Sequence, residues 1–586
     1  MLLPDLPVEL LESISENLDS ERSISAFSRA NRHLHNLLTG HIYHHNARWC
    51  GSSALIWAAR QGREETVRKA LRWGADVQDA SQLLLVEALQ VASAGGHETI
   101  VQLLLKNNAD VNAEGGEYGS ALQAASAGGH ETIVQLLLDK NADVNAQDGE
   151  YGDALLAASL EGHEKIVKLL IENDADVNAQ GGYYANALQA ASAGGHEKIA
   201  QLLLDKNADA DAQGGGYGNA LQAASAGGHE TIVQLLLDKN VDVNAHGGEY
   251  GNALQAASLE GHEKIVQLLI GNDADANIQG GEYGNALQAA SAGGHERIVQ
   301  LLIENYADVN TQGGEYGNAL QAASLEGHET IVQLLLNKNA DVNAQDGGYG
   351  NALQAASLGG NETVVQLLLD KNADVNAQGG EYGNALLAAS AGGHEKIVQL
   401  LIDNNADANA QGGHYESALQ RGARYGNALQ AASTRGHEKT VQLLIENDAD
   451  VNAQGGEYGS ALQAASLEGH EKIVQLLIEN DTDVNVQGGC YRHALQAASA
   501  RGHETVVQLL IENDADVNIQ GGYYGNALQA ASAGGHEKIV QLLLDKNADV
   551  NAQGGYYANA LQAAMARGHE KIAQLLLDKN ADNYIQ

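Results

Sequence analysis

Residues 284–314 read GNALQAASAGGHERIVQLLIENYADVNTQGG, and close copies of this stretch recur every 33 residues along most of the 586-residue chain. Self-similarity at a period of 20 to 50 residues indicates a solenoid, in which each unit buries its apolar face only against its neighbours. The sequence therefore predicts about sixteen stacked units. Their register is set by the residue after a Gly-Gly or similar step, found at Arg63, His97, His130, His163, His196, His229, His262, His295, His328, Asn361, His394, His437, His470, His503, His536 and His569.

One unit predicts two short helices and a loop. Asn285 suits a helix N-cap, and the small residues after it form a helix that neighbours can approach closely. Gly293 and Gly294 end that helix, and apolar residues at helical spacing predict a second one from about His295. The Gly-Gly pair at residues 313–314 then predicts a projecting, hairpin-like loop.

The second helix is usually followed by Asn, as at Asn141, which suits a left-handed C-cap. We expect Val241 and Tyr306 to take this place in two units. A β-branched residue with positive φ is strained, so Val241→Gly is expected to raise stability.

At these positions the unit resembles the ankyrin repeat, with its Ala-Ala, Gly-His, apolar helix and Ala-Asp-Val-Asn. Asn-Ala-Leu-Gln stands where the ankyrin pattern has Thr-Pro-Leu-His. The resemblance covers about nine-tenths of the chain. It implies an all-α ankyrin-repeat solenoid over residues 51–586 that binds a target protein without catalysis.

The net charge of the chain limits the classes of partner that it is expected to bind. A net charge of −42 argues against nucleic acid or an anionic membrane as the main partner, and leaves proteins as the default. The two cysteines, Cys50 and Cys490, give no disulfide framework. The first residues, MLLPDLPVELLESISENL, place carboxylates where a secretion signal needs an apolar run. We expect an intracellular protein, cytoplasmic or nuclear, that is monomeric on its own.

Residue types that could support chemistry give no catalytic constellation. The His-Glu pair repeats in HEKIV or HETIV without a second His, so we expect these histidines to satisfy loop backbone. A histidine cluster near Cys50 lacks the paired spacing of a zinc site, and a polar face is favoured there. The sequence predicts no enzyme, no cofactor and no metal site. The cluster comprises His33, His35, His41, His44 and His45.

From Tyr118 onward, every loop carries a tyrosine at a shared position. The favoured interpretation is that each ring packs between adjacent loops, and the alternative is an exposed ladder that grips a partner. These tyrosines are Tyr118, Tyr151, Tyr184, Tyr217, Tyr250, Tyr283, Tyr316, Tyr349, Tyr382, Tyr415, Tyr425, Tyr458, Tyr491, Tyr524 and Tyr557.

The units that deviate lie mostly in the last third. Arg435, Arg501 and Arg567 end the first helix of their units, where other copies have Glu161, Glu260, Glu326 or Glu468. Ten extra residues interrupt the period near 414–425. Arginine and tyrosine on protruding loops are typical of interface hot spots, so residues 411–503 are the predicted partner-binding surface. Neutral drift among duplicated copies remains open. The candidates are Tyr415, Arg421, Arg424, Tyr425, Arg435, Tyr491, Arg492, His493 and Arg501.

Residues 1–48 lack the repeat and predict three short helices. Their opening resembles an F-box, the motif by which a substrate receptor docks on the Skp adaptor of a cullin-RING ubiquitin ligase. The combination with these repeats resembles a class abundant in filamentous fungi. The resemblance implies a substrate receptor that contacts the adaptor, and through it the cullin. The alternative is that these helices only cap the solenoid. The implied adaptor-binding residues are Leu6, Pro7, Glu9, Leu10, Leu11, Ile14, Leu18 and Phe27.

Overall fold

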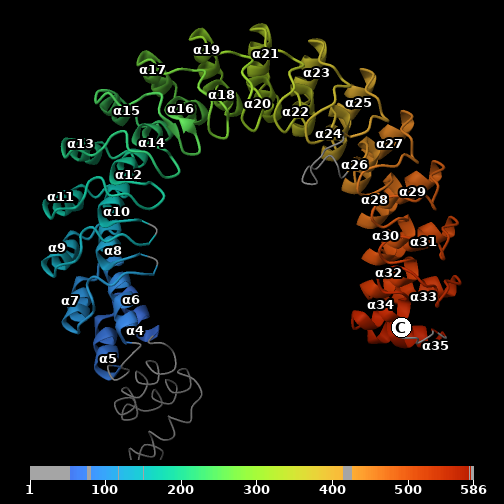
Figure 1. Cartoon of the computed structure of the whole chain (residues 1–586), viewed down its shortest axis with the longest axis horizontal. Helices are drawn as coiled ribbons and strands as arrows, with labels where there is room; N and C mark the ends of the chain where they lie inside the picture. Colours follow the sequence, from blue (N-terminus) through green and yellow to red (C-terminus); the bar gives the residue numbers. More distant parts are fainter. Residues whose placement is uncertain are drawn as a thin grey trace, which may run out of the picture. The chain divides into compact units, whose positions relative to one another are not determined.

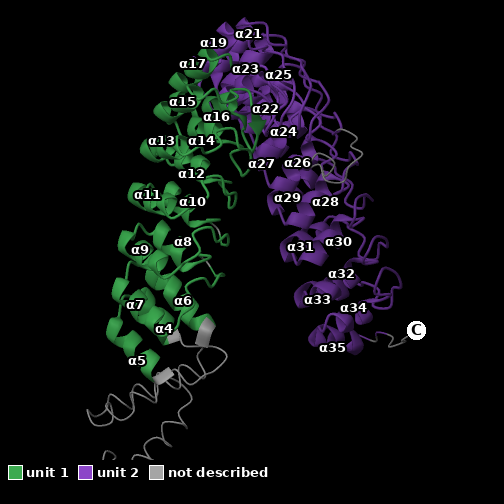
Figure 2. Ribbon diagram, turned by 60° about the vertical axis from the view of Figure 1, so that its left-hand side comes forward, with its two compact units in different colours: residues 1–275 green, residues 276–586 purple. Residues whose placement is uncertain are grey.

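The structure, a computed structural model, describes residues 53–74, 81–116, 118–149, 151–412, 425–579 and 581. Over these residues, helices α4 to α35 form sixteen consecutive helix pairs, as the period predicts. The F-box-like helices and all eight implied adaptor-binding residues lie outside the described residues. The chain divides into two compact units, residues 1–275 and 276–586, which are coloured separately in Figure 2.

In each unit the first helices of the pairs form one row and the second helices form another (Figure 1). In the first unit, the first helices are α4 Ser53–Arg60, α6 Ser81–Ala94, α8 Ala121–Ala127, α10 Ala154–Leu160, α12 Ala187–Ala193, α14 Ala220–Ala226 and α16 Ala253–Glu260. The second helices are α5 Glu64–Gly74, α7 Glu98–Lys106, α9 Glu131–Asp139, α11 Glu164–Glu172, α13 Glu197–Asp205, α15 Glu230–Leu237 and α17 Glu263–Gly271.

The second unit has the same arrangement. Its first helices are α18 Ala286–Ala292, α20 Ala319–Glu326, α22 Ala352–Gly359, α24 Ala385–Gly392, α26 Ala428–Arg435, α28 Ala461–Glu468, α30 Ala494–Arg501, α32 Ala527–Gly534 and α34 Ala560–Ala566. Its second helices are α19 Glu296–Glu304, α21 Glu329–Asn337, α23 Glu362–Asp370, α25 Glu395–Asp403, α27 Glu438–Glu446, α29 Glu471–Glu479, α31 Glu504–Glu512, α33 Glu537–Asp545 and α35 Glu570–Asp578.

In most repeats the first helix begins with a side-chain cap, as predicted. The Asn285 side chain accepts a hydrogen bond from the backbone N–H of Gln288, and the Gln288 side chain accepts one from Asn285 N–H in return. This capping box satisfies two of the donors that every helix start leaves unpaired. The second helix, α19, follows after Gly293 and Gly294, and buries Ile298, Val299 and Leu302.

In most repeats a buried glutamine ties the first helix to the next loop. Gln321 in α20 donates from Nε2 to the carbonyl oxygens of Ala344, Asp346 and Gly350, at 3.3, 3.2 and 2.9 Å. These carbonyls belong to the following loop, so the glutamine satisfies backbone groups that the stack buries. The loops themselves are tight hairpins, shown most regularly by the antiparallel strands β1 His246–Gly247 and β2 Gly251–Asn252.

The core runs along the stack rather than through one centre. The two adjacent alanines in the middle of the first helices are buried because successive first helices pack closest, and small side chains allow that approach. In α20, Ala322 and Ala323 have no exposed surface, and Leu320 beside them is 1 % exposed. Each repeat therefore depends on its neighbours for burial, as expected for a solenoid.

The left-handed residue after the second helix is confirmed at Asn141, with a φ of 60°, and at Tyr306, with a φ of 66°. The expectation for Val241 is wrong. In that repeat the left-handed residue is Asn240, and Val241 follows it with only 6 % of its surface exposed. Val241 replaces the alanine of Ala-Asp-Val-Asn and packs in the core, so a glycine there removes a buried side chain.

The stack stays in register on both sides of the ten extra residues. Gly412 N–H, before them in the sequence, donates to Gly426 O, after them, at 2.8 Å. Asn409 still bonds the backbone of Asp450 at 2.7 Å in the next repeat, as its counterparts do elsewhere. Tyr415, Arg421 and Arg424 fall in residues 413–424, outside the described residues.

Candidate protein-interaction surface

The loop tyrosines stack on one another within each unit. Tyr184, Tyr217 and Tyr250 form one run in the first unit, with ring centroids 5.8 and 6.0 Å apart and planes within 20° of parallel. In the second unit the stacked pairs are Tyr283 with Tyr316, Tyr316 with Tyr349, Tyr425 with Tyr458, and Tyr491 with Tyr524, at 6.0 to 6.2 Å. The favoured interpretation, that each ring packs between adjacent loops, is confirmed for these pairs.

In some repeats the hydroxyl of the loop tyrosine bonds the residue ten positions later, at the end of the first helix. Tyr250 donates to Glu260 Oε1 at 3.2 Å, whereas Arg435 Nε donates to the Tyr425 hydroxyl at 3.0 Å. A phenol can donate to a carboxylate or accept from a guanidinium, so the position tolerates either sign of charge. Burial and the Glu326 carboxylate raise the pKa of Tyr316 to about 12, which keeps that phenol protonated.

The loop tips, the residues just before each ladder tyrosine, change character along the second unit. Up to the loop that precedes α28, glutamates occupy four of the tips, at Glu282, Glu315, Glu381 and Glu457. The tips that precede α30, α32 and α34 are Cys490, Tyr523 and Tyr556, and all three are exposed. Tyr523 and Tyr556 stack on each other with centroids 5.1 Å apart, and are 51 % and 71 % exposed. Large exposed aromatic side chains are typical of interface centres.

The loop before α30 departs from the common pattern at two adjacent residues. Arg492 has a φ of 67°, at a position where Gly284, Gly317 and Gly525 stand in other repeats. His493 replaces the N-cap Asn, makes no capping bond and is 1 % exposed. Neither ring nitrogen of His493 has a hydrogen-bond partner among the described residues. Burial, and then Arg492, lower its pKa below the ordinary histidine value.

The repeat pattern matches a family model described as ankyrin repeats in three copies. The overlapping matches cover residues 24–115, 55–148, 89–181, 121–214, 155–247, 188–280, 253–346, 347–412, 413–488, 462–554 and 495–586. The chain belongs to the ankyrin-repeat family. Ankyrin arrays are protein-interaction scaffolds and are typically non-catalytic. No significant match to a curated protein was found.

The predicted partner-binding residues of this ankyrin array divide by exposure. Arg435, Arg492 and Arg501 are exposed, and Tyr491 is half-buried in the ladder. Tyr425 and His493 are buried, at 3 % and 1 % exposed. Arg435 and Arg501 are the last residues of α26 and α30, so they occupy the same place two repeats apart.

Sequence reasoning left Tyr523, Tyr556 and Arg567 out of the predicted surface, which ended at residue 503. Arg567 Nε donates to the Tyr557 hydroxyl at 2.8 Å, and its guanidinium lies 5.9 Å from the centre of that ring. The available signal was the doubled tyrosine in GGYYGN and GGYYAN, where most copies have Glu-Tyr.

The repeated histidines have the structural role expected of them. His328 Nε2 lies 3.1 Å from Ala292 O, at the end of the first helix in the preceding repeat. A carbonyl only accepts, so Nε2 carries the proton. Gly294 allows this approach, since a Cβ there would lie 2.6 Å from His328 Cε1. The residue in this place in another copy, Asn361, makes the same contact with Leu325 O at 2.7 Å.

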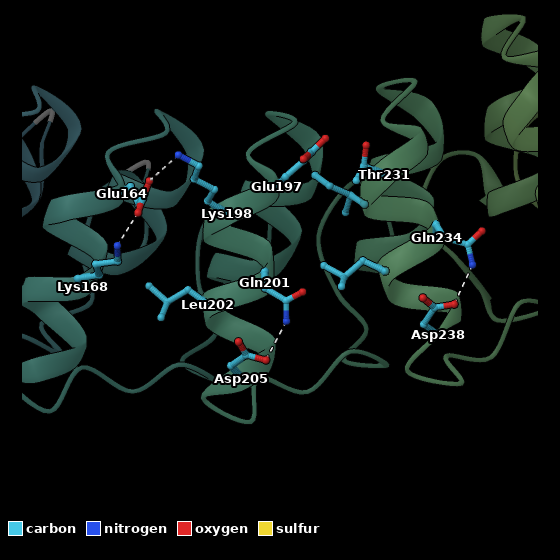
Figure 3. A pocket seen from close by; sticks show the side chains of 12 residues that line it. Glu164, Lys168, Glu197, Lys198, Gln201, Leu202, Asp205, Thr231, Gln234 and Asp238 are labelled. Carbon is cyan, nitrogen blue, oxygen red and sulfur yellow. Dashed lines mark hydrogen bonds and ion pairs between the residues drawn. The ribbon is translucent and has the colours of Figure 1, made fainter.

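On the second-helix face, charged side chains pair with one another in many repeats. Lysines there pair with glutamates of the preceding repeat, as Lys264 does with Glu230 at 3.2 Å and Lys538 with Glu504 at 3.0 Å. A shallow groove across α11, α13 and α15 is lined by such pairs, including Lys198 with Glu164 (Figure 3). Gln201 in the groove donates to Asp205 at 2.8 Å. Most charged and amide side chains that line the groove are therefore already paired within the protein.

The described residues contain no cluster of three or more His, Cys, Asp or Glu side chains placed to hold a metal ion. None of their helices combines the length and the apolar character that crossing a membrane requires.

Proposed function

We propose that this protein is a non-catalytic scaffold that binds a target protein along its loop tips and the adjoining ends of its first helices. The observation that supports this is the contrast between the two faces. Many repeats carry similar Glu-Lys pairs on the second-helix face, whereas on the loop face the residues change both in the sign of their charge and in aromatic content. A surface that binds a specific partner needs such differences, because identical repeats cannot fix a register.

Site-specific photo-crosslinking in the full chain tests this proposal. A benzophenone side chain is placed at Tyr523 on the loop face, and in a matched variant at Lys538 on the second-helix face, where both residues are exposed. We expect one set of proteins to crosslink at Tyr523 and not at Lys538. Capture of the same proteins from Lys538 would refute binding on the loop face. So would the capture of no protein both from Tyr523 and from a further variant with the crosslinker at Arg501.

We also propose that residues 1–48 dock the array on a Skp-type adaptor of a cullin ubiquitin ligase. The support is the order and spacing of Leu6, Pro7, Leu10, Leu11 and Ile14 in the sequence. Target proteins held by the repeats would then be presented for ubiquitin transfer.

Co-purification of the full chain with adaptor and cullin distinguishes this docking from a capping role. Wild type is compared with the double variant Leu10→Ala and Leu11→Ala, and hydrogen exchange is measured in α4 and α5. Loss of adaptor with unchanged protection of α4 and α5 supports docking. Absence of adaptor in wild type, with faster exchange of α4 and α5 in the variant, means that the segment is a cap.

A further inference from the structure

The α30 loop combines two local defects with a distinctive surface. A side chain at positive φ destabilises the backbone relative to glycine, and the neighbouring histidine leaves a helix start uncapped. The side chain of Arg492 nevertheless packs closely against Gly522. A Cβ added to Gly522 would lie only 3.0 Å from Arg492 Cγ. The aliphatic stem thus lies against the Gly-Gly turn of the next loop. Strained residues that surrounding structure holds in place are a reason to look for function.

Around this loop the acidic character of the protein is interrupted. Arg501 and Gly534 end α30 and α32, Arg567 directly follows α34, and the tips of these three repeats carry no carboxylate. On the side of α28, Glu457 at the tip and Glu468 at the helix end bound this region. In a chain with a net charge of −42, it is a local cationic and aromatic surface. We call it the tyrosine-arginine strip, formed by Tyr491, Arg492, Arg501, Tyr523, Tyr556 and Arg567.

The spacing of the strip matches an extended polypeptide. Ladder rings are 6.2 Å apart at Tyr491 and Tyr524. An extended chain rises about 3.3 Å per residue, so it advances about two residues per repeat and turns alternate side chains toward the strip. Arg501 and Arg567 are two repeats apart, or about 12 Å at this spacing, which corresponds to about four residues of such a chain.

We propose that the tyrosine-arginine strip binds an extended acidic segment of a partner protein, with carboxylates at every fourth residue and an apolar residue midway between them. The carboxylates pair with Arg501 and Arg567, Arg492 adds a third cation, and the apolar residue contacts Tyr523 and Tyr556. This inference rests on the proposed binding of a target along the loop face and specifies the chemistry of that target.

Fluorescence anisotropy with labelled nine-residue peptides tests the spacing. The peptide DSLSDSLSD has the inferred pattern, and DDSLSLSSD has the same composition with the acids rearranged. We expect the full-length protein to bind the first peptide at least fivefold more tightly. The preference should shrink as salt rises, because exposed charge pairs are screened. Equal binding of the two peptides, or binding of neither, would overturn the inference.

Matched variants separate the strip from charge in general. Arg501→Glu with Arg567→Glu should weaken binding of DSLSDSLSD at least tenfold, and Arg492→Gly about threefold. Arg297→Glu alters charge on α19, a second helix, and should leave binding within twofold. An equal loss in Arg297→Glu would mean general electrostatics and refute the strip.

Analytical ultracentrifugation of the same proteins completes the test. A self-associated wild type that the strip variants convert to monomer would refute the acidic segment and assign the strip to a second copy of this chain. If the peptides fail while photo-crosslinking at Tyr523 still captures a target, the proposed function stands without this inference. If both fail, binding on the loop face is itself refuted.

Discussion

His493→Asn should stabilise the α30 repeat, because it restores the N-cap that most other repeats have. In wild type, His493 is 1 % exposed, makes no capping bond, and has no hydrogen-bond partner among the described residues. Regaining a cap contributes about 1 kcal/mol, and relieving an unpaired buried polar group contributes about 1 to 3 kcal/mol. Part of the second term is already counted in the first. We therefore expect a gain of about 1 to 2 kcal/mol near pH 7.5.

The gain should increase in acid. The folded-state pKa of His493 is lowered by burial and by Arg492, so the folded protein favours the neutral ring. Below the unfolded value of about 6.5, the unfolded chain takes up a proton that the folded chain resists, and stability falls. Asparagine does not titrate. The difference between variant and wild type should thus be constant above about pH 7 and grow between pH 6.5 and 5.

Hydrogen exchange of α30 peptides is the suitable assay, since a solenoid opens in parts and a single midpoint does not isolate one repeat. The reciprocal control is Asn526→His in α32, where Asn526 forms a complete capping box. It should destabilise its repeat by a similar amount and make it acid-sensitive. If His493→Asn leaves α30 exchange unchanged at both pH 7.5 and pH 5, the uncapped and desolvated description of His493 is wrong.

Three further substitutions test the backbone and the ties between repeats. Tyr306→Asn should stabilise α19 by about 1 kcal/mol, because Tyr306 is left-handed at 66° and 89 % exposed, and hydrogen exchange of α19 would show it. Val241→Gly should lower stability by about 1 to 2 kcal/mol in the same assay on α15, through loss of a buried side chain. His328→Ala should destabilise α21 by about 1 to 2 kcal/mol by leaving Ala292 O unpaired, and His328→Asn should restore most of it; equal loss in both would contradict the hydrogen-bond explanation.

The fold could be predicted from the sequence because the 33-residue period repeats local signals. The Asn285 cap, the Gly-Gly stop and the apolar spacing of α19 each act within a few residues, and all three are confirmed. The error at Val241 was a shift by one residue. Tyr306 precedes Ala-Asp, whereas Val241 is itself in the place of the alanine, and local composition hardly distinguishes the two.

The candidate surface was harder to predict because it depends on contacts between repeats. The sequence shows that Tyr425 and Arg435 are ten residues apart, but not that the guanidinium binds the phenol or that the ring is buried. Nor does it show that neighbouring rings are about 6 Å apart, which sets the match to an extended chain. Tyr523 and Tyr556 were missed because their stacking joins the tips of two different loops, a contact between repeats.

The same modular stability bears on whether the deviations in the α30 loop are functional. A repeat array is held together by terms from each unit and each interface, so a weak unit between strong neighbours is tolerated. Tolerance alone would let Arg492 and His493 accumulate by drift. The two explanations differ for Arg492→Gly, which relieves the left-handed strain in either case. Under drift the variant gains stability and binds the acidic peptide as before, whereas a functional Arg492 gains stability and loses affinity, the trade-off expected where strain supports binding.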